Sequence, residues 1–276
     1  MGNTVFKDNV TIVTGASSGI GRELALQLAD QGAVLVLASR SLDQLEKIAA
    51  DCRRRGAKAL VVKTDVGLES ECKHLIDKAF GEFGRIDTLI NNAGYSTGGR
   101  LDEQPDLKAF QNVMEVNFMG SVWCTYYALP YLKKTRGRIV MVSSVLGKVA
   151  IWGSTVYAAS KFAMAGFSDI LRNELRSEGV SLTAVYPGYV VTNFAGNVIK
   201  PDGQKMGEQG QKLYTDKMMT ASECARIILK ASAKRKRERV LSFSGKLGVF
   251  LNKISPRLID WISIKAQKHR AKKQNS

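Results

Sequence analysis

Residues 10–21, V-T-I-V-T-G-A-S-S-G-I-G, join a short run of β-branched residues to a glycine-rich segment. The first five residues predict a buried strand, and an amphipathic helix follows the glycines. Gly15 permits a tight turn, while Gly19 and Gly21 let the backbone approach a pyrophosphate at the helix N-terminus. The spacing is G-x-x-x-G-x-G, which differs from the general G-x-G-x-x-G pattern. Strand, glycine turn and helix together predict the first half of a dinucleotide-binding unit.

The second predicted strand, residues 33–38, ends in Ser39-Arg40-Ser41. An NAD-binding protein places an acidic residue here to bind the ribose 2′-hydroxyl. This chain has Arg40 instead, and a guanidinium suits a 2′-phosphate through charge-assisted hydrogen bonds. We therefore expect NADP(H) as the cofactor, with a solvated arginine that opens the next helix as the alternative.

Helices and strands alternate through the rest of the first 233 residues. The patterns predict helices near 42–55, 69–83, 106–116 and 154–177, and strands at 59–64, 86–90, 138–143 and 180–186. This alternation predicts an α/β fold: a single doubly wound, Rossmann-type parallel sheet with helices on both faces. Ligands bind at the carboxyl ends of the strands in such sheets.

Polar or small residues follow several of these strands. Asp65 could accept a hydrogen bond from an adenine amino group, or it could be an ordinary turn residue before a helix. The small residues of Asn91-Asn92-Ala93-Gly94 would let a cofactor pass close to the backbone. Asn117 lies in a segment that looks buried, and a buried amide is costly without hydrogen-bond partners.

Tyr157 and Lys161 are four residues apart on the predicted helix 154–177, and Ser144 precedes the tyrosine by thirteen residues. An i,i+4 pair shares one helix face. A nearby ammonium favours the phenolate and should lower the phenol pKa from ~10 toward neutrality. A serine hydroxyl beside the phenol would polarise a substrate oxygen. This trio could protonate a carbonyl oxygen, or deprotonate an alcohol, without a metal; a solvated surface pair is the alternative.

Taken together, these motifs resemble those of the short-chain dehydrogenase/reductase family over roughly residues 8–232. The matching residues are Thr14-Gly15-x-x-x-Gly19-x-Gly21, Asn91-Asn92-Ala93-Gly94, Asn117, Ser144, Tyr157-x-x-x-Lys161 and Pro187-Gly188 with Thr192. The motifs have the order and spacing of that family, and Arg40 matches its NADP-preferring branch.

The resemblance implies a role for each matched residue. Tyr157 would be the general acid/base, and Lys161 would lower its pKa and bind the nicotinamide ribose. Ser144 would orient the substrate oxygen, Asn117 would anchor a water-linked proton relay, and Thr192 would contact the carboxamide. The implied cofactor-binding residues are Gly15, Ser17, Ser18, Gly19, Ile20, Gly21, Arg40, Ser41, Asp65, Val66, Asn91, Ala93, Gly94, Tyr157, Lys161, Pro187, Gly188 and Thr192. The implied activity is hydride transfer between NADP(H) and a carbonyl or alcohol.

The composition is that of a soluble globular protein, with 45% hydrophobic and 24% charged residues. Four cysteines without C-x-x-C pairs predict free thiols in a reducing compartment, and with only two histidines we expect no metal site. The chain shows no secretory signal and no apolar run of about 18 residues. We therefore expect a cytoplasmic protein.

The residues expected near the substrate are mainly apolar. They lie in Leu146–Trp152, at Tyr189, and in a loop from Phe194 to about Thr220, and Lys148 is the only charge in 145–153. This favours a hydrophobic, lipid-like carbonyl compound. The alternatives are a reductase of small soluble ketones and a catalytically silent NADPH sensor, although a sensor would not need the complete set of catalytic residues.

The net charge of +16 is concentrated at the end of the chain, where residues 234–276 hold 13 Lys/Arg against two acidic residues. We expect residues 1–233 to form the NADP-binding catalytic domain and 234–276 to form a basic amphipathic helical extension. Its two predicted helices, about 246–254 and 256–269, could pack on the body or a second subunit, or could lie on an anionic membrane surface. Nucleic acid is not expected, because the basic run lacks a reading motif.

The extension resembles that of family members that act on lipids and steroids, including 3-ketosphinganine reductases. We expect the protein to form a homodimer or homotetramer.

Overall fold

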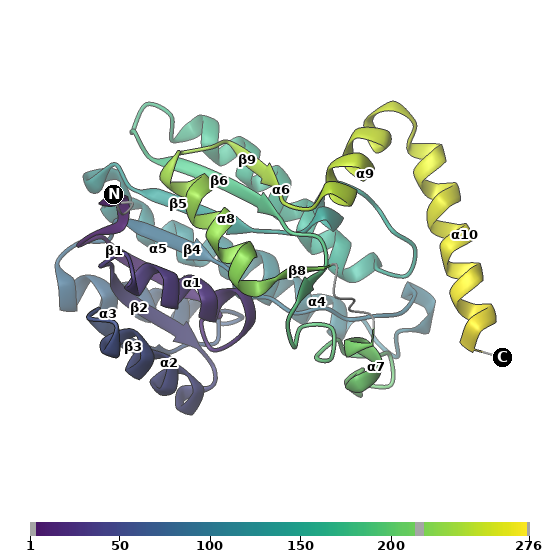
Figure 1. The fold of residues 1–276 in the computed structure, drawn as a ribbon, viewed down its shortest axis with the longest axis horizontal. Helices are drawn as coiled ribbons and strands as arrows, with labels where there is room; N and C mark the ends of the chain where they lie inside the picture. The colour runs from purple at the N-terminus through teal and green to yellow at the C-terminus, as the bar shows by residue number, and fades with distance from the viewer. Residues whose placement is uncertain (1–3, 213–217, 275–276) are drawn as a thin grey trace.

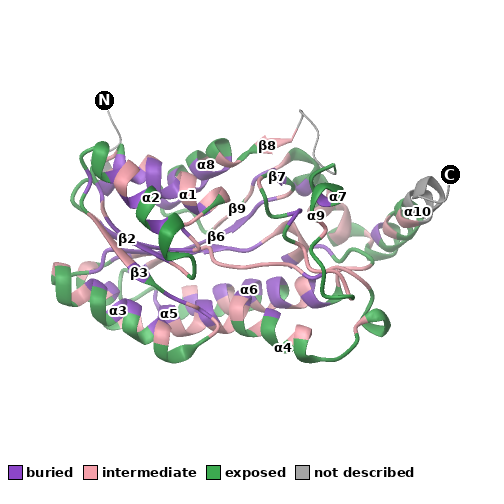
Figure 2. Ribbon diagram, turned by 90° about the horizontal axis from the view of Figure 1, so that it is seen from below, coloured by how far each residue is buried: buried purple, intermediate pink, exposed green. Residues whose placement is uncertain are grey.

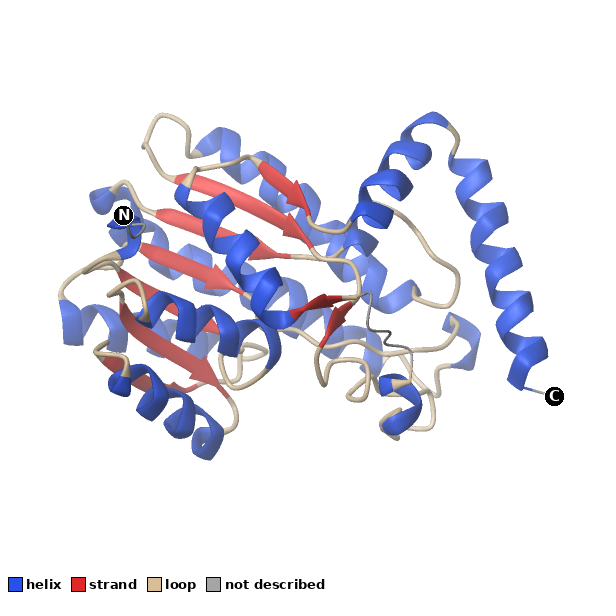
Figure 3. Cartoon of the chain, in the orientation of Figure 1, coloured by secondary structure: helices blue, strands red, loops and turns tan. Residues whose placement is uncertain are grey.

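A seven-stranded parallel sheet forms the centre of the computed structural model, which describes residues 4–212 and 218–274 (Figures 1 and 3). The strands lie in the order β3-β2-β1-β4-β5-β6-β9. Their bounds are β1 Val10–Thr14, β2 Val34–Ser39, β3 Ala59–Lys63, β4 Thr88–Asn91, β5 Arg138–Val142, β6 Ser181–Tyr186 and β9 Glu238–Val240. The predicted doubly wound α/β fold is confirmed.

Helices cover both faces of the sheet (Figure 2). One face carries α1 Gly19–Ala29, α2 Leu42–Arg54 and α8 Ala221–Ala233; the other carries α3 Glu69–Phe83, α4 Lys108–Met114, α5 Gly120–Thr135 and α6 Thr155–Glu174. Alternate residues of one strand enter opposite hydrophobic cores: Val13 packs on the first side and Ile12 on the second. Because both faces are buried, the strands are continuous hydrophobic runs.

The strand order reverses between β1 and β4, which are direct neighbours with Val13 opposite Ile90. The chain runs from β1 outward to β3, then crosses back to β4 and continues toward β9. The glycine turn after β1 and the segment after β4 therefore lie side by side. This is the place where sheets of this kind bind ligands.

The helix predicted near 106–116 is longer than expected. Helix α4 continues into a π-helical turn, Glu115–Met119, and then into α5, which ends at Thr135. Asn117 lies within this π-helical turn and is fully buried. Such turns are rare and are frequently found at functional sites.

The basic run that begins at Lys234 is built into the fold. Strand β9, within this run, pairs with β6 and places Glu238 opposite Ala184. The Arg235 guanidinium donates to the backbone carbonyls of Arg136 (2.7 Å) and Gly179 (3.0 Å). The sheet therefore extends past residue 233, and the part of the chain outside it starts after Val240.

Two ion pairs attach the same run to the rest of the molecule. Arg237 pairs with Asp169 on α6, with a separation of 2.9 Å between Nη2 and Oδ1. Glu238 pairs with Lys148, with 2.8 Å between Oε2 and Nζ. These charges have partners within the protein, so they contribute little to a basic surface.

The chain ends in two helices, α9 Phe243–Ile254 and α10 Pro256–Gln274, which project from the body (Figure 1). Ser242 and Ser255 cap them, accepting hydrogen bonds from the N–H groups of Gly245 (3.1 Å) and Leu258 (3.3 Å). Both helices agree with the amphipathic segments expected from the sequence. Among the described residues, no helix is long and apolar enough to cross a membrane. The four cysteines are free and buried, as their spacing predicted.

Candidate active site

The turns that follow β1 and β4 are locked together by Thr14. Its Oγ1 accepts hydrogen bonds from the backbone N–H groups of Asn92 (2.9 Å) and Ala93 (3.0 Å). The Asn92 side chain donates in return to the carbonyl oxygen of Thr14 (2.9 Å). The two segments therefore form one rigid edge beside the N-terminus of α1.

Three glycines of the first turn could not be replaced by larger residues without strain, for two different steric reasons. Gly15 and Gly19 have φ angles of +65° and +53°, which side chains rarely tolerate. Gly21 has no room for a side chain, because a Cβ there would lie 2.2 Å from the carbonyl oxygen of Gly15. Ser17, Ser18 and Ile20 lie in the same segment, where the free N–H groups of α1 would favour an anion.

The residues expected to bind the adenosine half lie at the ends of β2 and β3. Arg40 is exposed and, within the described residues, its side chain has no hydrogen bond or ion pair, so it is available to a ligand. Ser41 precedes α2 as its N-cap residue. Asp65 Oδ1 accepts from the N–H of Gly67 at 3.0 Å, which makes one carboxylate oxygen a turn acceptor. Val66 is buried and packs closely against the π-helix end of α5 at Gly120.

The two predicted asparagines point away from open solvent. The Asn91 side chain is 2% exposed and donates to Thr125 Oγ1 on α5 at 2.9 Å, so only its backbone lies at the ligand edge. The Asn117 amide bonds to the backbone of Tyr95 twice, accepting from its N–H and donating to its carbonyl, both at 2.9 Å. Gly94 gives Asn117 space, because a Cβ there would lie 3.0 Å from Oδ1.

Ser160 is a residue of this network that the sequence analysis did not identify. The Asn117 Nδ2 donates to Ser160 Oγ at 3.0 Å, and Ser160 Oγ donates to the carbonyl oxygen of Tyr157 at 2.7 Å. Ser160 thereby connects the buried asparagine to the first turn of α6. Its position next to Lys161 is the one feature of the sequence that could have indicated Ser160. Its contact with Asn117 is visible only in the three-dimensional structure.

The structure brings Ser144, Tyr157 and Lys161 together. The Ser144 hydroxyl lies near the Tyr157 phenol and acts to lower its pKa. Lys161 is 3% exposed, and its Nζ lies 5.6 Å from the centroid of the Tyr157 ring. Gly147 permits this approach, because a Cβ there would lie 2.5 Å from the Lys161 carbonyl oxygen.

The protonation states differ from the sequence expectation. Burial raises the pKa of Tyr157 to about 12, although the nearby Ser144 hydroxyl acts in the opposite direction. Burial lowers the pKa of Lys161 to about 8. The expected drop of the phenol pKa toward neutrality is absent, because burial penalises the phenolate more than its neighbours favour it. The Lys161 ammonium faces the ring and also donates to the Val142 carbonyl at 3.3 Å. At neutral pH the phenol therefore keeps its proton, which is the form needed to donate one.

One aromatic side chain lies beside this trio, and three further apolar residues of the segments expected near the substrate are exposed. The Phe194 ring lies 6.0 Å from the Tyr157 ring, and Ile151, Trp152 and Tyr189 are also partly exposed. Lys148, the only charge in 145–153, is paired with Glu238 and is not free to bind a substrate. The expected loop from Phe194 to about Thr220 contains α7 Glu208–Gln211 and ends in β8 Met219–Thr220, which pairs with β7 Val190–Val191 just before the loop. Residues 213–217 lie outside the described residues.

The remaining predicted residues, Pro187, Gly188 and Thr192, follow strand β6. The Pro187 carbonyl accepts from the N–H of Val145 at 2.9 Å, which fixes the segment after Ser144. Gly188 lies directly against Ser242, since a Cβ there would be 2.6 Å from Ser242 Oγ. Thr192 contacts the glycine turn, at 3.4 Å from a Cβ placed on Gly19.

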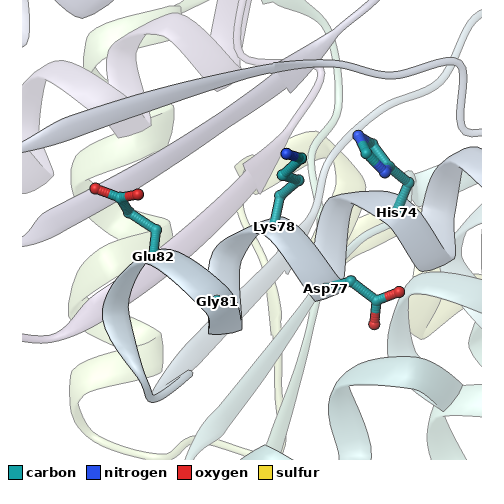
Figure 4. A pocket seen from close by; sticks show the side chains of 5 residues that line it. All are labelled: His74, Asp77, Lys78, Gly81 and Glu82. Carbon is teal, nitrogen blue, oxygen red and sulfur yellow. The ribbon is translucent and has the colours of Figure 1, made fainter.

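A surface hollow on α3 is unrelated to this site (Figure 4). Its lining residues are His74, Asp77, Lys78, Gly81 and Glu82. All five are exposed and come from one helix, and the side chains spread apart instead of converging on a point. Within the described residues, no group of three or more His, Cys, Asp or Glu side chains could bind a metal ion.

Comparison with known proteins shows one family. A family model described as short chain dehydrogenase matches residues 9–202. A "Dehydrogenase/reductase SDR family protein 7-like" of Dictyostelium discoideum is 35% identical over 97% of this chain and 84% of its own length. An "11-beta-hydroxysteroid dehydrogenase" of Pinus massoniana is 35% identical over 91% of this chain and 72% of its own.

Solved structures agree with these relatives. A short-chain dehydrogenase/reductase from Burkholderia phymatum in complex with NAD has a TM-score of 0.83 and 26% identity, covering 92% of this chain and 96% of its own. An alcohol dehydrogenase from Thermococcus sibiricus, complexed with 5-hydroxy-NADP, has a TM-score of 0.70 and 27% identity, covering 84% and 95%.

The close approach at Gly21 generates a stability prediction. Gly21→Ala should destabilise the chain by about 2 kcal/mol or more, because a rigid backbone oxygen occupies the space of the new Cβ. Gly166→Ala on α6 is the matched control, since nothing lies within 4 Å of its Cβ position. That change should be neutral or stabilising, as alanine favours helix by ~1 kcal/mol. Thermal unfolding measures both, and equal melting temperatures for the two variants would contradict the packing described at Gly21.

Proposed function

The chain belongs to the short-chain dehydrogenase/reductase family, and we propose that it is an NADP(H)-dependent oxidoreductase that interconverts a carbonyl group and a secondary alcohol. The observation that carries this proposal is the assembly of Ser144, Tyr157 and Lys161, with the buried Lys161 ammonium 5.6 Å from the centroid of the Tyr157 ring, so that the phenol can act as proton donor. A proton donor of this kind contributes typically ~10²–10⁴-fold to a rate.

The glycine turn, the N-terminus of α1 and the unpartnered Arg40 fit a nicotinamide dinucleotide, which when bound supplies hydride chemistry. The residues of the chain do the rest. Ser144 Oγ orients the carbonyl oxygen of the substrate, and Tyr157 gives that oxygen its phenolic proton. Lys161 stabilises the phenolate that remains, and Asn117 anchors the path by which the proton returns. For alcohol oxidation the same groups act in reverse.

The preference for NADP(H) rests on Arg40. The known structures similar to this chain include one in complex with NAD and one with an NADP derivative, so they support the nicotinamide class and not one member of it. Arg40 is exposed at the end of β2, where a 2′-phosphate would lie, and has no acidic partner among the described residues. A guanidinium there would favour the phosphate-bearing cofactor.

A hydrophobic, steroid-like or lipid-like substrate is the third part of the proposal. The exposed side chains that we expect at the substrate opening, Ile151, Trp152 and Tyr189, are apolar or aromatic. The Phe194 ring lies beside the phenol of Tyr157. Several relatives are named 11-beta-hydroxysteroid dehydrogenases, which supports a substrate of similar size and polarity.

Peripheral contact with an anionic membrane is the fourth part, and α9 is the surface that supports it. Phe243, Leu247, Phe250 and Ile254 are 80%, 47%, 60% and 65% exposed, and their spacing of four, three and four residues places them on one helix face. Lys246 and Lys253 are exposed on the same helix. After Val240 the sequence holds eight Lys/Arg and one acidic residue, Asp260.

This combination of an apolar face and basic flanks is typical of helices that lie in a lipid interface. Helix α10 adds Trp261, which is 58% exposed, with the Lys265 ammonium 4.7 Å from its ring. Contact with the body is also present, since Ser263 Oγ of α10 accepts from the Trp152 N–H at 2.8 Å. We therefore propose a cytoplasmic protein whose two C-terminal helices contact the body with one side and touch a bilayer with the other.

Self-association is a further part of the proposal. Tyr126 on α5 and Phe162 and Ile170 on α6 are exposed by 66%, 44% and 62%, and both helices cover the same face of the sheet. A homodimer or homotetramer would cover them. The mass of the full chain in solution decides this point.

Tyr157→Phe tests the catalytic proposal. The variant should bind NADPH as the parent does, because the ring remains, and should lose at least about 100-fold in kcat for ketone reduction. NADPH oxidation and cofactor titration measure the two properties. A variant that kept more than about a tenth of the parental activity would remove Tyr157 from the role of proton donor.

Arg40→Asp tests cofactor choice. Loss of a charge-assisted bond and gain of repulsion should weaken NADPH binding by about 10- to 100-fold and change NADH binding much less. Lys58→Asp is the control, because it makes the same charge reversal at an exposed position directly before β3, at the edge of the sheet opposite to Arg40. It should affect the binding of neither cofactor. Equal losses for NADPH and NADH in the Arg40 variant would show that this arginine does not recognise the phosphate.

Phe250→Glu tests the lipid contact. The full chain should co-sediment with vesicles of phosphatidylserine and phosphatidylcholine, and only weakly with phosphatidylcholine alone, since each basic residue adds ~1 kcal/mol at an anionic surface. The variant should lose most of this binding, because a carboxylate replaces an inserted ring. Leu107→Glu, at an apolar position 66% exposed elsewhere, is the control and should bind as the parent does. Parental binding by Phe250→Glu would exclude α9 as the contact.

A further inference from the structure

The loop between β5 and α6 has two differently supported halves. Its first half follows Ser144 and is fixed to the body, with Val145 N–H donating to the Pro187 carbonyl (2.9 Å) and Gly147 N–H to the Ser144 carbonyl (2.8 Å). Its second half extends away from the sheet toward α10 (Figure 1). There the Trp152 N–H donates to Ser263 Oγ of α10 at 2.8 Å.

Helix α9 lies over the first half of the same loop. Asn252 Nδ2 donates to the Lys148 carbonyl at 3.2 Å. Gly245 lies so close that a Cβ on it would be 2.7 Å from the Val145 side chain. The terminal helices therefore contact the substrate-side loop near its start, at its middle and near its end.

The hydrogen bond at Ser263 joins α10 to the outer end of the loop. Among the described side chains of α10, Ile259 is buried and Ser263 is half-buried, while most of the others are exposed. Packing alone does not require a serine on the helix surface to face this loop, which lies 111 residues away in the sequence. Its hydroxyl supplies an acceptor to a backbone N–H that has no other hydrogen bond among the described residues.

We propose that Ser263 is a positioning residue that determines substrate size: it holds the Trp152 backbone, and with it the apolar outer side of the substrate opening. The inference rests on the proposed function and deepens it, because it assigns the preference for large hydrophobic ketones to a residue of the C-terminal extension. A small ketone would contact only Ser144, Tyr157 and nearby side chains. A large one would extend to Ile151 and Trp152.

The catalytic groups do not depend on this bond. Ser144 is held by the sheet and by Leu146, whose N–H donates to Ser144 Oγ at 3.1 Å. Tyr157 and Lys161 are fixed on α6, with the Lys161 carbonyl accepting from Ser143 Oγ at 3.1 Å. Removal of the Ser263 hydroxyl should thus leave the chemical step intact and loosen only the outer part of the opening.

The test is Ser263→Ala in the full chain, with NADPH oxidation measured on an 11-keto steroid and on cyclohexanone. The KM for the steroid should rise about two- to tenfold, the range expected for one hydrogen bond, with kcat for both ketones and KM for cyclohexanone unchanged. Ser263→Thr keeps the hydroxyl and should restore the parental KM. Ser244→Ala, at an exposed serine of α9, is the matched control and should behave as the parent.

The outcomes separate the inference from the function it rests on. A parental KM for the steroid in Ser263→Ala would overturn the role of Ser263 alone. Equal losses on both ketones, together with a lower melting temperature and no rescue by threonine, would show a merely structural brace and would also overturn it. A parent chain that oxidises NADPH with neither ketone would overturn the proposed function itself.

Discussion

The buried amide of Asn117 is the contact on which the geometry of the site depends. Its Oδ1 accepts from the Tyr95 N–H, and its Nδ2 donates to the Tyr95 carbonyl and to Ser160 Oγ. It therefore joins the π-helical turn, the segment after β4 and the first turn of α6. An amide buried without partners would cost ~1–3 kcal/mol, so these three segments are held in one arrangement. Tyr157 acquires its position from the same network, since Ser160 bonds to its carbonyl oxygen.

Much of the fold could be predicted from local patterns. The alternation of strands and helices indicated a parallel sheet covered on both faces, and the helix predicted near 69–83 has the same bounds as α3. The motif residues that follow β1 and β4 lie side by side, because these strands are direct neighbours, and Ser144 follows the next strand, β5. Ser160 and Gly147 were not identified, because their importance comes from contacts with residue 117 and with the Lys161 carbonyl, and no local pattern records such contacts.

Composition was a poorer guide in the C-terminal segment. The basic run from Lys234 to Arg239 suggested a charged extension, whereas Arg235 and Arg237 bond to the body and Glu238 belongs to an edge strand. A charge count does not distinguish a guanidinium that faces solvent from one that caps backbone carbonyls. The features that suit a lipid surface lie later, on α9 and α10, whose other side contacts the substrate loop. One segment thus connects the proposed membrane contact to the proposed substrate opening.

The central claim is that Tyr157 donates a proton beside a charged Lys161, and the pH dependence of the reaction in both directions tests it most directly. Tyr157, with a pKa of about 12, stays protonated across the working range, whereas Lys161 loses its charge near pH 8. Ketone reduction should therefore be constant below pH 8 and should fall above it, as the phenolate loses its stabilising ammonium, while alcohol oxidation should rise with pH. Reduction that accelerates between pH 7 and 10 would contradict the assignment of the proton donor.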